Sequence, residues 1–397
     1  MYRGLSGRVP YATPWNLSYE ERLRMLKPNT VCIGYVYEEP DTSTFRYRVF
    51  NMVESINAVP AALSATWFTR EDYQAGPEFL KRVNVLVLCR VRYDDAVARL
   101  IEAAKARAIA VVFDVDDLVC DPRLVHLIVH TLDVPVSADA WDYWFAYVSR
   151  LHACLMQCDC ATTTNAFLAS RLQAIRPGLR CAVIPNFLNR RQVHLADQLL
   201  ASRLQGRPSR DRSVTIGYLS GTPSHNRDLL VAVPALIRLI KKYPHVRLRI
   251  VGFNPGGKDL ESVKGNIDYE PLQDFLNLQR ITAECELTIA PLQDNVFTNC
   301  KSELKYFEPA IVGCPVVASP TFAFKAAITD GVNGFLATAY DWYETLERVL
   351  HLLEGDAEQI EALSASARSH AEMNYGWQQT ARIVTSYEKI VDSVSFG

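Results

Sequence analysis

The apolar residues of this chain fall into short runs that alternate with amphipathic segments, in two successive series. In the first series, the runs 31–37 and 83–91 have the length and β-branched content of buried strands. Residues 94–106 have helical periodicity with an acidic first turn and a basic last turn, and the strand-like run 108–117 follows. A strand, a helix and a strand with short joins predict a βαβ unit of a parallel sheet.

Further elements complete two α/β halves. The first half adds a weaker strand near 62–67, a helix from about Thr44, helical residues 118–157, strands 158–164 and 181–186, and a helix over 165–174. The second half begins with strand 213–221 and continues with strands 247–253 and 287–292 and a short one near 334–337. Its helices are expected over 228–243, 271–283, 342–353 and 357–374.

The segment between the two halves is charged and has no strand pattern. It ends in Gly, Pro, Ser and Arg, as linkers often do. We therefore predict an α/β fold with two Rossmann-like domains, 1–190 and 213–376, a linker over 191–212, and a last helix within 377–397.

Length and composition agree with two globular domains. The chain has 397 residues, of which 49% are hydrophobic and 22% charged. A net charge of −2 argues against bulk nucleic-acid binding. No run approaches the roughly 20 apolar residues of a membrane span, and the first residues lack a signal-peptide core, so a cytoplasmic protein is expected.

The ten cysteines are mostly scattered singly in apolar runs, which indicates reduced core residues. One cluster, His152, Cys154, Cys158 and Cys160, leaves a zinc site conceivable, although core cysteines are favoured. The aromatic residues of segment 141–147 could stack on sugar or contact lipid, but a buried seam between helices is favoured.

The stretch 298–319 carries the most informative chemistry. Ser302 is expected to begin a helix that Gly313-Cys314-Pro315 ends. A helix N-terminus with Lys301 and Lys305 beside it can hold an anion, and we expect the diphosphate of a sugar nucleotide there. The alternative is an ordinary capped helix.

Other polar residues stand where parallel strands are expected to end. Asp114, Asp116 and Asp117 close one strand, and the loop 218–228 follows another. Arg46 and Arg48 lie in the first turn of their helix, where cations are unfavourable unless an anion is near.

Residues 213–390, with IGYLSGTPSHNRD, LRIVGF, LTIAPLQDNVFTNCKSELKYFEPAIVGCPVVAS and ITDGVNGFLA, resemble the C-terminal half of a GT-B glycosyltransferase. More narrowly, they resemble the retaining family 4, or "glycosyl transferases group 1", which contains bacterial mannosyl- and rhamnosyltransferases. Residues 31–187 resemble the acceptor domain more loosely. The resemblance implies a GT-B fold, with two Rossmann-like domains facing a central cleft and the last helix crossing back to the first.

Individual roles are implied by the same resemblance. Glu308 matches the second glutamate of the family's E-x7-E motif, which binds the donor ribose, and Cys300 stands where the first, sugar-binding glutamate is usual. Asn299 or Glu303 is a possible substitute. The full set of implied donor-binding residues is Ser220, Gly221, Thr222, Arg227, Asn299, Cys300, Ser302, Glu303, Leu304, Lys305 and Glu308.

Two smaller groups complete the expected site. His225, Asp116 and Lys301 are placed near the reacting centre. Thr44, Arg46 and Asp117 are placed on the acceptor side, where Thr42–Thr44 replace the family's glycine-rich turn.

The expected activity is transfer of a hexosyl or deoxyhexosyl group from a nucleotide-diphospho-sugar to a glycan or lipid-linked glycan, in bacterial surface polysaccharide synthesis. The resemblance implies retention, no obligatory metal or other cofactor, and possible peripheral contact with the cell membrane. Asp114-Val115-Asp116 also resembles the D-x-D metal motif of another glycosyltransferase fold, but a second Rossmann-like half disfavours that fold. A sugar-nucleotide epimerase and a catalytically silent nucleotide-sugar-binding protein remain alternatives, whereas NAD binding lacks its glycine motif.

Overall fold

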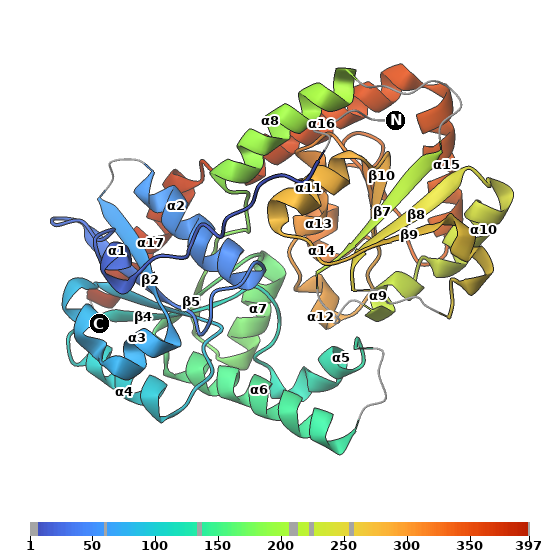
Figure 1. The fold of residues 1–397 in the computed structure, drawn as a ribbon. Helices are drawn as coiled ribbons and strands as arrows, with labels where there is room; N and C mark the ends of the chain where they lie inside the picture. Colours follow the sequence, from blue (N-terminus) through green and yellow to red (C-terminus); the bar gives the residue numbers. More distant parts are fainter. Residues whose placement is uncertain are drawn as a thin grey trace.

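The computed structural model of the protein describes residues 7–58, 62–132, 137–205, 213–221, 226–253 and 258–395. Its described strands form two six-stranded parallel sheets, each flanked by helices (Figure 1). The predicted α/β architecture with two Rossmann-like halves is confirmed.

The first sheet has the strand order β2-β1-β3-β4-β5-β6. Helices on both faces bury β1 to β4, which explains their nearly continuous apolar sequences. The strands are β1 Val31–Val36, β2 Leu63–Phe68, β3 Val85–Cys89, β4 Ala110–Val115, β5 Cys160–Thr163 and β6 Arg180–Val183. The helical elements are α1 Tyr19–Leu23, η1 Arg46–Phe50, α2 Asn51–Asn57, α3 Arg70–Ala75, η2 Pro77–Arg82, α4 Asp95–Lys105, η3 Pro122–Leu124, α5 Val125–Val129, α6 Ala138–Gln157 and α7 Ala166–Ile175.

The second sheet has the order β12-β11-β10-β7-β8-β9. Its strands are β7 Val214–Ser220, β8 Val246–Gly252, β9 Ile267–Glu270, β10 Leu287–Ala290, β11 Val316–Ala318 and β12 Phe335–Leu336. Its helical elements are α9 Asn226–Leu230, α10 Val233–Lys242, η5 Glu261–Asn266, α11 Phe275–Ala283, α12 Val296–Asn299, α13 Leu304–Ala310, α14 Phe322–Ala327, α15 Trp342–Gly355 and α16 Ala357–Tyr375. The expected helix 228–243 is divided, since α10 begins with Pro234 in its first turn.

Two helices join the halves. Most of the segment expected as a linker is helix α8, Arg190–Gln205, which packs against α11 and lies beside α16 in Figure 1. The last helix, α17 Thr380–Ser395, packs against α2 and β4 of the first half, and the hydroxyls of Tyr35 and Tyr387 are 2.7 Å apart.

An apolar cluster shared by both halves sets their relative position. Trp15 packs edge-on to Phe45 of the first half at a ring-centroid distance of 5.5 Å, and stacks on Phe275 of α11 at 6.3 Å. The same cluster includes Tyr306 and Phe307 of α13. The start of α13 is therefore held against the first domain through a common core.

Within the described part of the chain, no helix has the length and apolar character needed to cross a membrane.

Candidate donor site

The helix that carries Glu308 begins one residue later than expected. Its first residue is Leu304 rather than one directly after Ser302, and no side chain caps it. The Ser302 hydroxyl instead accepts a hydrogen bond from Asn186 Nδ2 of the first half at 3.1 Å. The expected end is confirmed, because Gly313 has the positive φ of 68° that follows a helix C-terminus.

Cys300 lies in the apolar core of the first domain, with Phe297 and Cys120 in the same cluster. Its side chain is fully buried, and burial raises the pKa of the thiol to about 12. Asn165 caps α7 with its Oδ1 and donates its Nδ2 hydrogens to the carbonyls of Cys300 and Lys301 at 3.0 and 3.3 Å. The first position of the E-x7-E pattern thus anchors the loop to the other half.

The two residues considered as substitutes for the missing glutamate have contacts elsewhere in the protein. Asn299 donates to Asp294 at 2.9 Å and accepts from the Phe322 backbone N–H at 2.8 Å. Glu303 is buried near Tyr375 and Arg382, and burial raises the pKa of its carboxyl to about 7. Their roles in sugar recognition stay predictions.

Glu308 meets the first domain through one oxygen. Its Oε1 accepts hydrogen bonds from Arg46 Nη1 and Nη2 at 3.2 and 3.1 Å, from the Tyr47 hydroxyl, and from Gln192 Nε2 at 3.3 Å. Among the described residues, no hydrogen bond reaches Oε2 of this carboxylate. One oxygen of Glu308 is therefore committed to protein contacts.

Both arginines at the start of the first-domain helix have anionic partners, as the dipole argument expected. Arg46 pairs with Glu308, and its guanidinium lies 4.1 Å from the centre of the Tyr47 ring. Arg48 donates from Nε and Nη2 to the two oxygens of Asp114 at 3.0 and 2.6 Å. Arg46, expected on the acceptor side, is thus joined to the residue expected to bind the donor ribose.

The two lysines of the stretch differ in their surroundings. Lys301 is buried, with its Nζ 3.7 Å from Asp117 and 4.5 Å from the centre of the Phe297 ring. The Lys305 Nζ is also buried but has no hydrogen-bond partner in the described part of the chain. It lies 5.1 Å from the centre of the Tyr218 ring, and burial lowers the pKa of Lys305 to about 8.

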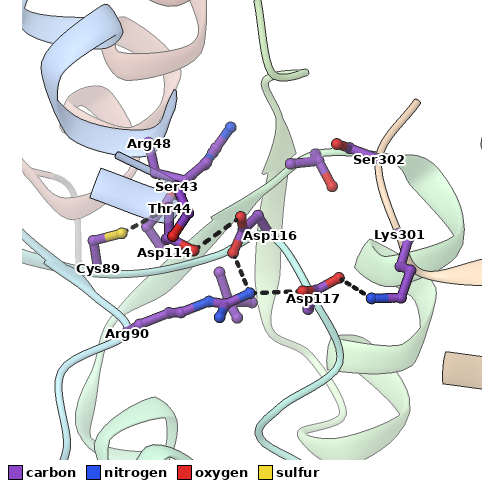
Figure 2. A network of polar contacts seen from close by, with 12 residues as sticks. Ser43, Thr44, Arg48, Cys89, Arg90, Asp114, Asp116, Asp117, Lys301 and Ser302 are labelled. Atoms are coloured by element: carbon purple, nitrogen blue, oxygen red, sulfur yellow. Dashed lines mark hydrogen bonds and ion pairs between the residues drawn. The ribbon is translucent and has the colours of Figure 1, made fainter. Parts of the chain in front are cut away.

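The acids at the end of β4 differ in their partners: Asp114 pairs with Arg48, whereas Asp116 and Asp117 contact Arg90 (Figure 2). Asp114 is buried and accepts hydrogen bonds from Arg48 and from Thr162 Oγ1 at 2.6 Å. Asp116 lies 2.6 Å from Arg90 Nη2, and burial raises the pKa of its carboxyl. The same Arg90 nitrogen is 2.9 Å from Asp117, which therefore bridges Arg90 and Lys301.

Asp116 contacts residues from two other segments of the first half, Thr44 between β1 and η1 and Arg90 directly after β3. Thr44 Oγ1 is 3.4 Å from Asp116 Oδ2, so the expected acceptor-side Thr44 does meet the expected reacting-centre carboxylate. Arg90, directly after β3, was missed from the sequence. Its position at the carboxyl end of a parallel strand was the signal that could have identified it.

The loop after β7 is described in part. Ser220 is buried at the end of the strand, and Gly221 follows it. Thr222 and His225 lie outside the described residues. Arg227 lies in α9 beside Asp228, whose Oδ1 accepts from the Gln293 backbone N–H at 3.2 Å. The Lys305 Nζ lies 5.1 Å from the centre of the Tyr218 ring in β7, so this strand and the start of α13 are neighbours.

The possible metal groups have other partners. The Asp114 carboxylate is taken up by Arg48 and Thr162, so the Asp114-Val115-Asp116 segment is not a pair of available ligands. Cys154, Cys158 and Cys160 are buried free thiols, and His152 Nδ1 lies 3.1 Å from the Cys120 carbonyl. The described residues contain no group of three His, Cys, Asp or Glu arranged to hold a metal ion.

Comparison with known proteins finds sequence similarity in the second half of the chain. Residues 213–355 match the family model described as "Glycosyl transferases group 1". D-inositol 3-phosphate glycosyltransferase from Mycobacterium marinum is 25% identical over 181 residues, which are 42% of this chain and 38% of that protein. The chain thus aligns with well under half of the length of this curated relative.

Solved structures match almost the whole chain. Anabaena HepE, in complex with UDP and glucose, covers 91% of this chain and 99% of its own at 14% identity and a TM-score of 0.58. A glycosyltransferase from Rickettsia africae covers 92% and 99%, at 13% identity and a TM-score of 0.60. At these identities the likeness concerns the fold. The comparisons support the resemblance seen in the sequence: the chain has the GT-B fold, and its residues 213–355 are similar to the glycosyl transferases group 1 model.

Proposed function

We propose that this protein is a glycosyltransferase that moves a sugar from a nucleotide-diphospho-sugar to a glycan or lipid-linked glycan. The observation that carries the proposal is the buried Nζ of Lys305, which has no hydrogen-bond partner among the described residues. A buried ammonium group without a partner is unfavourable unless a ligand supplies negative charge. Lys305 lies in the first turn of α13, where the resemblance to the family implies a diphosphate site.

The chemistry of transfer needs such a cation. Cleavage of the bond between the sugar and the diphosphate leaves negative charge on the departing phosphate. A positive group that is already in place and shielded from water stabilises this charge. In the proposed reaction Lys305 supplies it, the backbone at Ser302–Lys305 adds N–H donors, and Lys301 contributes from the Asp117 side.

Glu308 is proposed to bind the ribose. Its Oε1 is held by Arg46 and Tyr47, which fixes the orientation of the carboxylate. The Oε2 atom is the acceptor that ribose hydroxyls would use. The Anabaena relative in complex with UDP and glucose supports a uridine nucleotide as the first donor to test here.

The finer features are also proposals. The reaction is proposed to retain configuration as the wider family does, with no obligatory metal, and to transfer a hexosyl or deoxyhexosyl group for a bacterial surface polysaccharide. The departing phosphate is proposed to accept the acceptor proton with Asp116 near the reacting centre, and the catalytic role expected of His225 stays a sequence-based prediction. The proposed location is the cytoplasm, with peripheral contact at the inner face of the membrane where the acceptor is lipid-linked.

The position of Cys300 favours one rival function. Because this residue is buried in the first domain, the usual sugar-binding glutamate has no counterpart at that position. A protein that binds nucleotide sugar without turnover would be compatible with this feature.

Two measurements on one preparation separate these functions. Thermal stabilisation by UDP-, GDP- and dTDP-sugars tests donor binding, and release of nucleoside diphosphate with a mixed glycan and glycolipid acceptor fraction tests transfer. A transferase shows both, and a silent binding protein shows only stabilisation. An epimerase converts the donor sugar without an acceptor. No stabilisation by any of these sugars would overturn the donor site.

A further inference from the structure

Helix α6 presents a group of aromatic side chains to solvent. Five aromatic residues, here called the α6 aromatic face, stand within seven positions: Trp141, Tyr143, Trp144, Phe145 and Tyr147. Tyr143 is 57% exposed and Phe145 is 45% exposed, while the other three are half-buried. The buried seam expected for this segment is found for part of it: Trp141, Trp144 and Tyr147 pack against the core of the first half, whereas Tyr143 and Phe145 are exposed. Large exposed rings gathered in one place indicate a binding surface.

The rings form two groups on different sides of the helix, one of Tyr143, Trp144 and Tyr147 and one of Trp141 and Phe145. Tyr143 and Tyr147 stack with centroids 6.3 Å apart and an interplanar angle of 22°, and Trp144 packs edge-on to Tyr143 at 5.4 Å. On the other side of the helix, Trp141 and Phe145 have centroids 5.9 Å apart. Aromatic residues i and i+4 are neighbours on a helix, so this sequence spacing builds two separate pairs, Tyr143–Tyr147 and Trp141–Phe145.

At the C-terminal end of the α6 aromatic face, Tyr147 lies beside the arginines that follow β3. The Arg92 guanidinium lies 5.9 Å from the centre of the Tyr147 ring. Burial raises the pKa of Tyr147, and the charged groups that act on it are Arg90, Arg92, Asp116 and Glu38. The α6 aromatic face therefore extends outward from the Arg90–Asp116 pair, and its outer part lies at the N-terminal end of α6, which packs with α5 at the lower edge of Figure 1.

The charges around the rings help to choose the occupant. At the outer end of the rings, residues 124–149 contain no Lys or Arg, and Asp139 and Asp142 stand beside the rings in sequence; Arg90 and Arg92 lie at the inner, Tyr147 end. A surface that docks on anionic lipid needs basic residues beside its aromatic ones. Rings with neighbouring carboxylates instead fit a neutral sugar chain, whose C–H faces stack on the rings and whose hydroxyls donate to the acids.

We propose that the α6 aromatic face binds the glycan part of the acceptor, as an oligosaccharide of several units whose far end lies outside the cleft. This inference rests on the proposed function, because it makes the surface part of the acceptor path. The Tyr147 end receives the unit nearest the reacting centre, and Tyr143, which stacks with Tyr147, contacts a unit further along the chain.

The test compares three preparations: the parent protein, Tyr143→Ala, and Tyr340→Ala as a control at a 97% exposed tyrosine of the second half. Each is applied to a printed array of bacterial oligosaccharides, and the glycans retained are titrated by tryptophan fluorescence. We expect at least one glycan of three or more units to bind the parent protein. Loss of Tyr143 should weaken this binding about tenfold, while Tyr340→Ala leaves it unchanged. Tyr143→Phe, which keeps the ring, should retain most of the affinity.

Three results would overturn the inference: no array glycan is retained, Tyr143→Ala binds as well as the parent protein, or the variant loses binding to phosphatidylethanolamine–phosphatidylglycerol vesicles but not to glycans. Equal melting temperatures of the three proteins exclude unfolding as the cause of a loss. Stabilisation by nucleotide sugar, measured on the same samples, separates failure of this surface from failure of the donor site.

Discussion

Glu308 of the second half accepts two hydrogen bonds from the Arg46 guanidinium of the first, at 3.2 and 3.1 Å, both on Oε1. The side chains are 15% and 6% exposed, so the pair is largely shielded from water. The residue expected to bind the donor ribose therefore also links the two halves. Its substitution should change both donor binding and domain coupling, and the two effects can be separated.

The variant Glu308→Leu should lose about 3 kcal/mol of unfolding free energy, because it leaves Arg46 buried without its anion. Adding Arg46→Met should recover much of this stability, since an apolar pair of similar volume replaces the ions. Nucleotide-sugar binding should stay lost in the double variant. Denaturant titration and calorimetry measure the two effects, and recovery of donor binding by the double variant would contradict the ribose role.

Donor affinity should decrease as pH rises through about 8, because burial lowers the pKa of Lys305 to that value and only its protonated form attracts diphosphate. Affinity measured from pH 6.5 to 9.5 checks this. The variant Lys305→Arg should remain charged and show a flatter profile. A parent protein with unchanged affinity up to pH 9.5 would remove Lys305 from the site.

The same lysine has an effect on stability of the opposite sign. Its folded-state pKa of about 8 is below the ordinary lysine value of 10.5, so the unfolded chain binds more protons between these values. In the absence of donor, this group therefore raises the free energy of unfolding as pH increases from about 8 to 10.5. The difference between the parent protein and Lys305→Met over this range isolates the contribution.

Asp114→Asn should destabilise the fold by about 3 kcal/mol or more, because it leaves the fully buried Arg48 without its charge partner. Asp268→Asn is the matched control: its partner Arg247 is 34% exposed, and the loss should be below about 1 kcal/mol. Chemical denaturation compares the two. Equal losses would contradict the claim that the buried Arg48–Asp114 pair contributes more to stability than the more exposed Arg247–Asp268 pair.

Restoring a glutamate at the first motif position should not restore the usual site. Cys300→Glu places a carboxylate in the apolar cluster around Phe297 and Cys120, where an unpaired charge costs several kcal/mol. We expect a lower melting temperature than for Cys300→Ala, without tighter donor binding. A stable Cys300→Glu protein with increased turnover would indicate that this position faces the donor sugar.

Much of the fold follows from local pattern. The buried parallel strands coincide with short apolar runs in the sequence, which have the length typical of strands. Gly313 ends its helix where expected. Strand β9 was missed because its sequence, IDYE, lies on a sheet edge where polar residues are tolerated. The helix α8 was missed because charged residues without a strand pattern are equally compatible with a linker.

The sequence allowed prediction of individual site residues from their type and spacing, but not of the contacts that surround them. Lys305 and Glu308 stood out by type and spacing, but their surroundings depend on residues far away in sequence. Ser302 has the right side chain for a helix cap, yet the Asn186 amide competes for it. Likewise, the exposure of Tyr143 depends on which elements pack against α6, and no property of its own sequence segment determines that.

The most direct test of the donor-site account is calorimetric titration of the parent protein, Lys305→Ala and Lys325→Ala with whichever of UDP-, GDP- or dTDP-sugar stabilises the parent most. Lys325 is an exposed lysine of α14 and serves as the control. We predict that Lys305→Ala weakens binding at least about tenfold, the typical loss of a charge-assisted hydrogen bond, whereas Lys325→Ala binds as the parent does. Equal affinities for all three proteins would contradict the proposal that Lys305 holds the donor diphosphate.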